Sequence, residues 1–200
     1  SSAASDVDKR QVYSAWGKSK YQVSSHHLGP ILCYSFGKYK LVRCNIRNYN
    51  IANGDILVFC FGEIDCRCHI HKHVTPTNSY QKNIDVIVAR YMEAILMNLR
   101  FCNKRFKAVC VYNVLPPVQK SNTVENDILP YLGTDEERKQ YVLYFNQCLK
   151  NACSQNGFVF FDIYNDCIDE NGYLNKEYSD NNVHMINGEI VDKFISKHLV

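Results

Sequence analysis

The stretch that decides the fold is "DILVFCFG", Asp55–Gly62. Its residues from Ile56 to Phe61 are apolar without interruption, and branched or aromatic side chains predominate among them. A continuous run of this kind is typical of a strand that helices cover on both faces, as in a parallel sheet. Two similar runs follow, "KAVCVYNVL" (Lys107–Leu115) and "FVFFDIY" (Phe158–Tyr164). The sequence therefore predicts a buried, mostly parallel sheet.

Amphipathic segments separate these runs. Residues 79–101 repeat apolar side chains at helical spacing. Residues 134–157 begin with the T-x-x-E pattern of a capping box and end at a glycine. A last amphipathic segment covers residues 186–200.

Two shorter stretches, Lys20–Ser24 and Lys40–Ile46, are predicted as further strands, with a helix beginning in residues 26–37. The resulting order is β-α-β-β-α-β-α-β-α. It predicts a three-layer α/β/α sandwich with a mostly parallel central sheet, of the flavodoxin-like type.

Length and composition limit the classes of protein. The 200 residues fit a single domain, 1–200, in which 1–17 form a peripheral extension. A formal net charge of +3, spread along the chain without a basic block, does not indicate a nucleic-acid partner. The apolar runs are far shorter than the ~20 residues of a membrane-spanning helix, so we expect no membrane partner.

The chain has ten cysteines and no N-x-[ST] sequon. Cys60 and Cys110 lie inside apolar runs, where cysteine behaves as a small hydrophobic residue. We expect reduced thiols and a cytoplasmic protein. The small, polar N-terminal stretch is unlike a signal peptide, although a leader removed before Ser1 is compatible with this sequence.

The candidate catalytic residues lie in the loops where predicted strands end. Ser25 follows the first of them, and Asp180 and His184 precede the last helix. A serine nucleophile needs a base within hydrogen-bond reach, and a carboxylate usually orients that base. Because the carboxyl ends of parallel strands share one edge of the sheet, we expect these side chains to meet there.

These residues resemble the blocks of the SGNH/GDSL hydrolase family, from about Lys20 to the C-terminus. Residues 23–26 (V-S-S-H) occupy the place of the family's G-D-S-H, and residues 62–65 (G-E-I-D) that of G-x-N-D. Residues 180–184 (D-N-N-V-H) resemble its D-x-x-H block, and the double proline at 116–117 also fits. "GEIDCR" is similar to a divergent branch of SGNH-like proteins.

The resemblance implies a serine ester hydrolase that needs no cofactor. Ser25 would be the nucleophile, His184 the base and Asp180 its orienter. By the same resemblance, the substrate would be a small-molecule or glycan ester, such as an acetyl group on a carbohydrate. Gly62, Glu63, Asp65, Arg67 and Asn181 would support the site or its oxyanion hole.

Three departures from the family pattern bear on this expectation. Val23 and Ser24 replace the glycine and aspartate of the first block, and Ile64 replaces an asparagine that donates to the oxyanion. Asn181, not Asp180, stands at the family's spacing from His184. Arg67 could supply positive charge in place of the lost donors.

Other readings of the same residues remain open. Ser25 could instead cap the first helix, and Asn181 could orient His184. Glu63 and Asp65 could be structural, one capping the next segment or pairing with Arg67.

Two further functions compete with hydrolysis. The altered oxyanion positions favour a non-catalytic module that binds a glycan or a protein. The cluster Cys66–His73 suggests a metal-dependent enzyme, because His69, His71 and His73 would share one side of an extended segment.

Overall fold

The computed structural model describes residues 15–124 and 127–200. Its centre is a parallel sheet in the order β1-β2-β3, formed by Ile56–Phe59, Ala108–Tyr112 and Val159–Phe161. Val58 pairs with Cys110, and Cys110 in turn pairs with Val159. Each strand lies inside one of the three long apolar runs, so those three predictions are confirmed.

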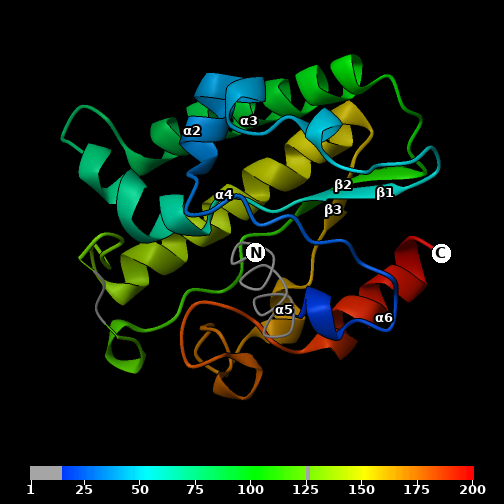
Figure 1. The fold of residues 1–200 in the computed structure, drawn as a ribbon. Coiled ribbons are helices and arrows are strands. Elements are labelled where there is room, and N and C mark those ends of the chain that lie inside the picture. Colours follow the sequence, from blue (N-terminus) through cyan, green and yellow to red (C-terminus); the bar gives the residue numbers. More distant parts are fainter. Residues whose placement is uncertain (1–14, 125–126) are drawn as a thin grey trace.

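Helices cover both faces of this sheet. The α-helices are α2 (Cys33–Tyr39), α3 (Tyr80–Cys102), α4 (Asp135–Asn156), α5 (Tyr164–Cys167) and α6 (Gly188–His198). Figure 1 shows α2, α3 and α4 on one side of the sheet and α5 and α6 on the other. Short 3-10 turns occupy Trp16–Lys18, Lys40–Val42, Ile46–Asn48, Ile70–His73, Lys120–Asn122 and Lys176–Tyr178, and a π-helical turn occupies Asp65–His69. The predicted α/β/α layering is confirmed.

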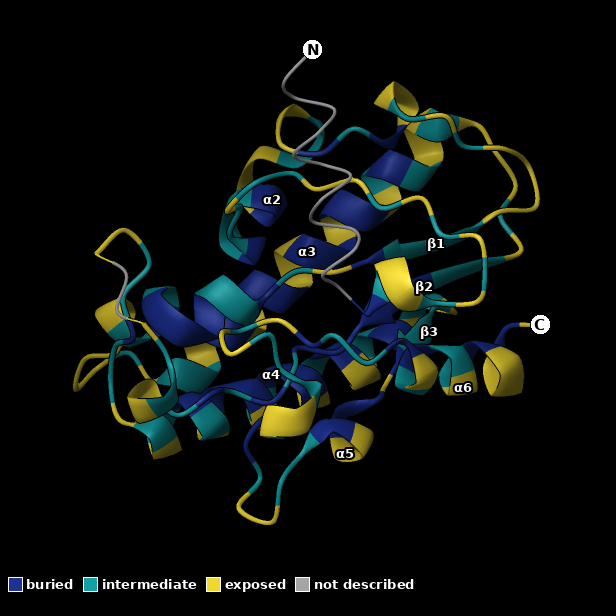
Figure 2. Cartoon of the chain, turned by 60° about the horizontal axis from the view of Figure 1, so that its bottom comes forward, coloured by how far each residue is buried: buried dark blue, intermediate teal, exposed yellow. Residues whose placement is uncertain are grey.

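The sheet separates two hydrophobic clusters. One, which includes Tyr91 and Phe145, lies under α2, α3 and α4, and the other, which includes Phe161 and Val191, lies under α6. Figure 2 shows buried stripes on the inner faces of the long helices and exposed residues on their outer faces. Apolar burial on both faces is what makes each strand a continuous apolar run.

The predicted ends of α4 are confirmed. The side chain of Thr134 accepts the backbone N–H of Glu137, and the Glu137 carboxylate accepts the backbone N–H of Thr134. Gly157, with φ of 68°, ends the helix in the left-handed conformation.

The two shorter predicted strands are wrong. Residues 20–24 are irregular, because their N-terminal side is held on α6, where Ser19 Oγ donates to Asp192. Residues 40–46 form turns instead of a strand. There Lys40 has a φ of 48°, and the Ile46 N–H donates to Asn98 Oδ1 of α3 at 3.0 Å. Tertiary contacts with a helix therefore override a strand-like pattern.

Of the extension expected at 1–17, residues 1–14 lie outside the described part of the chain. Ala15 is buried, and the ring of Trp16 lies 5.2 Å from that of Phe161 in the second cluster. All ten cysteines are free thiols. Among the described residues, no helix has the length and apolar character needed to cross a membrane.

Candidate active site

The loop before α6 joins a histidine to an aspartate. His184 Nδ1 lies 2.8 Å from Asp180 Oδ2, while Asp180 Oδ1 accepts the backbone N–H of His184 at 3.2 Å. The backbone N–H of Asp180 also donates to the carbonyl of His184 at 3.1 Å. The imidazole is 65% exposed and the carboxylate 25%. This arrangement orients an accessible imidazole by a carboxylate within five consecutive residues.

Asn181 does not make the contact that the family's spacing suggests. It is exposed and has a φ of 64°, a left-handed conformation that asparagine tolerates well. The backbone N–H of Asn182 donates to Asp180 Oδ1 at 2.9 Å, which closes a turn around Asn181. The extra residue between Asp180 and His184 is thus accommodated by this turn.

The segment after β1 enters a tight turn at Gly62. Its φ is 118°, and an added Cβ would lie 2.7 Å from Val114 Cγ2 and 3.1 Å from Phe145. Glycine is therefore required there for both backbone conformation and space.

Asp65, in that segment, is fully buried and structural in its contacts. Its carboxylate accepts the backbone N–H groups of Cys33 at 2.6 Å and Tyr34 at 3.0 Å, at the start of α2. This satisfies donors that the first turn of a helix leaves without intrahelical partners. Asp65 therefore has a capping role, but it caps α2, which precedes it in the chain, and not the next segment as expected.

Glu63 and Arg67 form a two-pronged ion pair. Arg67 Nε lies 2.7 Å from Glu63 Oε1 and Nη2 lies 3.1 Å from Oε2, while Nη1 donates to the carbonyl of Leu129 at 2.9 Å. The guanidinium also lies over the ring of Tyr131. Three of the five N–H bonds of Arg67 are therefore engaged within the protein.

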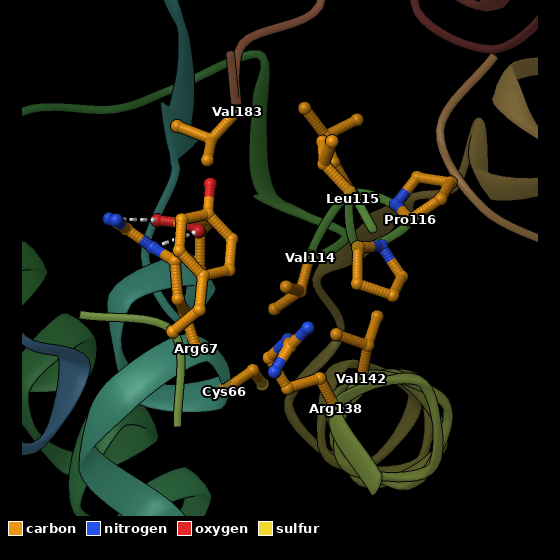
Figure 3. Close-up of a pocket in the computed structure, with 12 residues that line it drawn as sticks. Cys66, Arg67, Val114, Leu115, Pro116, Arg138, Val142 and Val183 are labelled. Atoms are coloured by element: carbon orange, nitrogen blue, oxygen red, sulfur yellow. Dashed lines mark hydrogen bonds and ion pairs between the residues drawn. The ribbon is translucent and has the colours of Figure 1, made fainter. Parts of the chain in front are cut away.

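The structure brings this ion pair to the histidine loop. A pocket with about 330 Å³ of empty space is lined by Glu63 and Arg67, by Val114–Val118 after β2, and by Val183 next to His184. We call it the strand-end pocket; Figure 3 shows Val183 facing Arg67 and Leu115 across it. Burial raises the pKa of Glu63, and nearby Arg67 and His184 lower it only in part. Glu63 and Arg67 of the segment after β1 and Val183 of the histidine loop therefore line one pocket, and Ser25 is not among its lining residues.

Ser25 lies in the irregular segment between the first 3-10 turn and α2, and is partly buried. Before it, the N–H of Ala15 donates to the carbonyl of Met185 at 2.9 Å, and the Lys18 backbone packs against Gly188. After it, Asp65 holds the start of α2. The segment with Ser25 thus runs between two anchors, one beside the histidine loop and one beside the turn after β1.

The reading of Ser25 as a helix cap is wrong. The cap position of α2 is Leu32, well beyond Ser25, and no side-chain hydrogen bond from Leu32 serves it. The donors at that end go to Asp65 instead.

The histidine cluster does not take the predicted extended form. His69 lies in the π-helical turn and His71 and His73 in the 3-10 turn that follows, so the three do not all share one side. The His69 ring packs beside Tyr34 and His73, and His71 Nδ1 lies 3.1 Å from the hydroxyl of Tyr141. Burial lowers the pKa of His69 to about 4. Across the described chain, no three His, Cys, Asp or Glu side chains gather as a metal site requires.

Two lining residues of the strand-end pocket were not predicted. Arg138 is buried in α4, with its Nη1 donating to the carbonyls of Leu132 and Gly133 and its Nη2 to Asp135. The guanidinium groups of Arg67 and Arg138 both lie over the ring of Tyr131, each about 5 Å from its centre. The available signal was helical spacing, because Arg138 falls on the buried face of α4 with Tyr141, Val142 and Phe145.

Comparison with models of known families and with curated protein sequences gives no match. Comparison with solved structures does. A proposed acylhydrolase from Bacteroides fragilis NCTC 9343 is similar with a TM-score of 0.54 and 14% identity, over 84% of this chain and 70% of that one. A GDSL-like lipase from Bacteroides thetaiotaomicron VPI-5482 is similar with a TM-score of 0.54 and 16% identity, over 84% and 70% of the respective chains.

The chain thus has the α/β fold of the SGNH hydrolases, with a parallel sheet between helical layers, at a large sequence distance. This agrees with the fold that the sequence blocks implied.

Proposed function

We propose that the protein is a serine ester hydrolase in which Ser25, His184 and Asp180 act together. The observation that carries the proposal is the 2.8 Å contact between His184 Nδ1 and Asp180 Oδ2 on an exposed imidazole. A carboxylate on Nδ1 fixes the ring and leaves Nε2 to take a proton. The SGNH fold, shared with acylhydrolase and lipase structures, supports the same reaction class.

The reaction would proceed in two stages. The Ser25 hydroxyl oxygen bonds to the acyl carbon while His184 Nε2 takes its proton, and Asp180 stabilises the imidazolium. The imidazolium then gives the proton to the leaving alkoxide as the ester C–O bond breaks. In the second stage water attacks the acyl-serine, His184 takes a proton from it, and the serine oxygen leaves with that proton. Esters suit this site better than amides because an alkoxide leaves more readily than an amine.

Negative charge on the tetrahedral intermediate has fewer partners than in the family pattern. Ile64 cannot donate where the family has asparagine, and loss of one such donor lowers kcat by ~10²–10³. The N–H bonds of Arg67 that Glu63 and Leu129 leave unused are the proposed substitute. We therefore expect slow turnover.

A non-catalytic binding module is the second candidate. It is favoured by Ile64 and by the engagement of Arg67 with Glu63, since together they weaken the oxyanion site. Such a protein would recognise a glycan or a protein without cleaving an ester.

A fluorophosphonate probe, which reacts with activated serine, tests the proposal. We expect wild type and Ser24→Ala to be labelled and to hydrolyse p-nitrophenyl acetate, while Ser25→Ala does neither. Ser24 is the matched control because it is the adjacent serine in the same irregular segment. Wild-type protein that is folded, unlabelled and without turnover would exclude the hydrolase and leave the binding module.

A further inference from the structure

Positive charge gathers on the surface beside α3, although it is spread along the sequence. Residues 38–55 and 90–107 contain nine of the 23 Lys and Arg residues and two of the 20 Asp and Glu residues. The fold joins the two stretches, because the turns between α2 and β1 lie along α3 (Figure 1) and the Ile46 N–H donates to Asn98 Oδ1 at 3.0 Å. We call the exposed side chains of these two stretches the basic face. The rest of the chain has an excess of acidic residues.

Most cations of the basic face have no acidic partner. Within the described residues, Lys40 is the one of the nine that forms an ion pair, with Glu93 at 3.1 Å, and the other eight are exposed. The carboxylate of Asp55, the second acidic residue, accepts the backbone N–H of Ala52. Cations near the C-terminus of α3 complement the helix dipole, but this role does not extend to those in the turns. Unpaired like charges on one face attract an anionic partner.

Apolar side chains project among these cations. Val42 is 87% exposed and is followed by Arg43. Phe101 is 52% exposed and lies one helical turn beyond Asn98, so its ring borders the same turns. Single exposed apolar residues are ordinary on a protein surface. Apolar side chains surrounded by cations, however, are typical of proteins that bind at the surface of anionic bilayers.

The third exposed apolar side chain, that of Tyr39, argues against single-stranded nucleic acid as the partner. Lys38 Nζ and the Arg43 guanidinium lie 5.1 Å and 5.4 Å from the centre of its ring. A ring engaged by two cations is not free to stack on a base, which is the contact that single-strand binding requires. Val42 is aliphatic and offers no stacking surface. The basic face therefore fits an anionic lipid surface better than a nucleic acid.

We propose that the basic face binds the surface of a membrane that contains anionic phospholipids. The lysine and arginine side chains pair with the headgroups, while Val42 and Phe101 enter the boundary with the acyl chains. Binding at a bilayer surface needs no spanning helix, and the described residues form none. The expectation of no membrane partner concerns spanning segments and does not extend to this contact.

The proposed contact leaves the candidate active site open. The Gly54 N–H donates to the carbonyl of Arg105 at 2.8 Å, so the loops that precede β1 and β2 lie side by side. The strand-end pocket is lined by residues that follow these two strands. Because β1 and β2 are parallel, the two loops and the pocket lie at opposite ends of the strands. Membrane attachment through the basic face therefore keeps the strand-end pocket accessible to solvent.

Co-sedimentation with vesicles tests the charge component. We expect wild type to bind phosphatidylcholine vesicles with about 30% phosphatidylserine at ~0.1 M salt, and to be released at ~0.5 M salt. The double variant Arg43→Gln/Arg47→Gln should lower the partition coefficient by about 30-fold, roughly 5-fold per cation. Lys197→Gln is the matched control and should change it little, because Lys197 is an exposed cation of α6, on the other side of the sheet.

Val42→Ser tests the apolar component on the same vesicles. It should lower the partition coefficient by about 3- to 10-fold, because a serine side chain gains little from entering the acyl boundary. Val200→Ser is the matched control, since Val200 is 66% exposed and follows α6. This control should bind as wild type does.

Three outcomes would overturn the proposal. The first is no binding to the anionic vesicles, or equal binding to vesicles of phosphatidylcholine alone. The second is a loss in Lys197→Gln as large as the loss in the arginine variant. The third is a loss in the arginine variant without one in Val42→Ser, and binding of a single-stranded oligoribonucleotide would then identify nucleic acid as the partner. None of these measurements depends on ester hydrolysis, so their failure leaves the proposed function untouched.

Discussion

Asp65 accepts the backbone N–H of Cys33 at 2.6 Å and so ties the first turn of α2 to the segment that follows β1. The carboxylate is fully buried, and burial raises its pKa from 3.8 to about 7, against the opposing effect of the N–H donors of Tyr34 and Cys33. The hydrogen bonds that hold the start of α2, which follows the Ser25 segment, therefore depend on the protonation state of Asp65.

Asp65 should make stability depend on pH. Between pH ~4 and ~7 the folded protein keeps the Asp65 proton that the unfolded chain has lost. Its contribution to the free energy of unfolding therefore falls as pH rises through this window, by at most about 1.4 kcal/mol per pH unit.

Urea unfolding of wild type and Asp65→Asn at several pH values measures this effect. The stability of wild type relative to the variant should decrease up to pH ~7 and stay constant above it. A difference that does not change with pH would mean that Asp65 has the same pKa in both states.

Asp180→Asn should lower kcat on p-nitrophenyl acetate by as much as ~10⁴, because an amide favours the wrong imidazole tautomer. The loop should persist, since an amide oxygen can still accept the N–H groups of Asn182 and His184 that Asp180 Oδ1 now accepts. Asn181→Ala should leave this rate nearly unchanged. The reverse ranking of the two variants would identify Asn181 as the residue that orients His184.

Gly62→Ala should destabilise the protein by about 2–4 kcal/mol, from a strained positive φ and from overpacking against Val114 and Phe145. Gly54→Ala is the matched control, because its φ is 88° but nothing lies within 4 Å of an added Cβ. It should cost only about 1–2 kcal/mol, the conformational part. Equal losses in thermal or urea unfolding would remove the packing argument at Gly62.

Arg67→Ala should destabilise the fold, because Glu63 would be left with its raised pKa and without its partner. The pair is 9% and 35% exposed, so a loss of about 1–3 kcal/mol, between surface and buried pairs, is expected. The double variant with Arg67→Met and Glu63→Gln should lose less free energy of unfolding than the sum of the losses of the two single variants.

Arg67→Lys separates structure from catalysis. If Arg67 stabilises the negative charge that develops in the reaction, Arg67→Lys should have a lower kcat and a nearly unchanged KM. Glu63→Gln should not lower kcat in this way. If Arg67→Lys and Glu63→Gln lower the stability equally and neither changes kcat, the Arg67–Glu63 ion pair has a purely structural role.

The elements that the sequence predicted correctly are those with strong local signals. The apolar runs around β1, β2 and β3 need burial on both faces, and the Thr134–Glu137 capping box specifies where α4 begins. The rule that parallel strands share one edge also suggested that the blocks around Gly62 and His184 lie near each other, and Glu63, Arg67 and Val183 line one pocket.

The incorrect elements depend on partners distant in sequence. Residues 40–46 alternate like a strand but are held in turns by Asn98 of α3. Asp65, Cys66, Arg67 and Cys68 are buried at consecutive positions, which a helical turn surrounded by α2 and α4 permits and an extended loop does not. No pattern within either segment identifies these contacts.

Hydrogen bonds within one short loop hold the His184–Asp180 pair, so its geometry requires little from the rest of the fold. The serine segment, in contrast, depends on anchors at α6 and at Asp65. During divergence, activity could be abolished by displacing that segment alone, with the histidine and aspartate left in register. On the proposed mechanism, an intact His184–Asp180 pair is therefore not sufficient for hydrolysis, which also needs the serine segment in place.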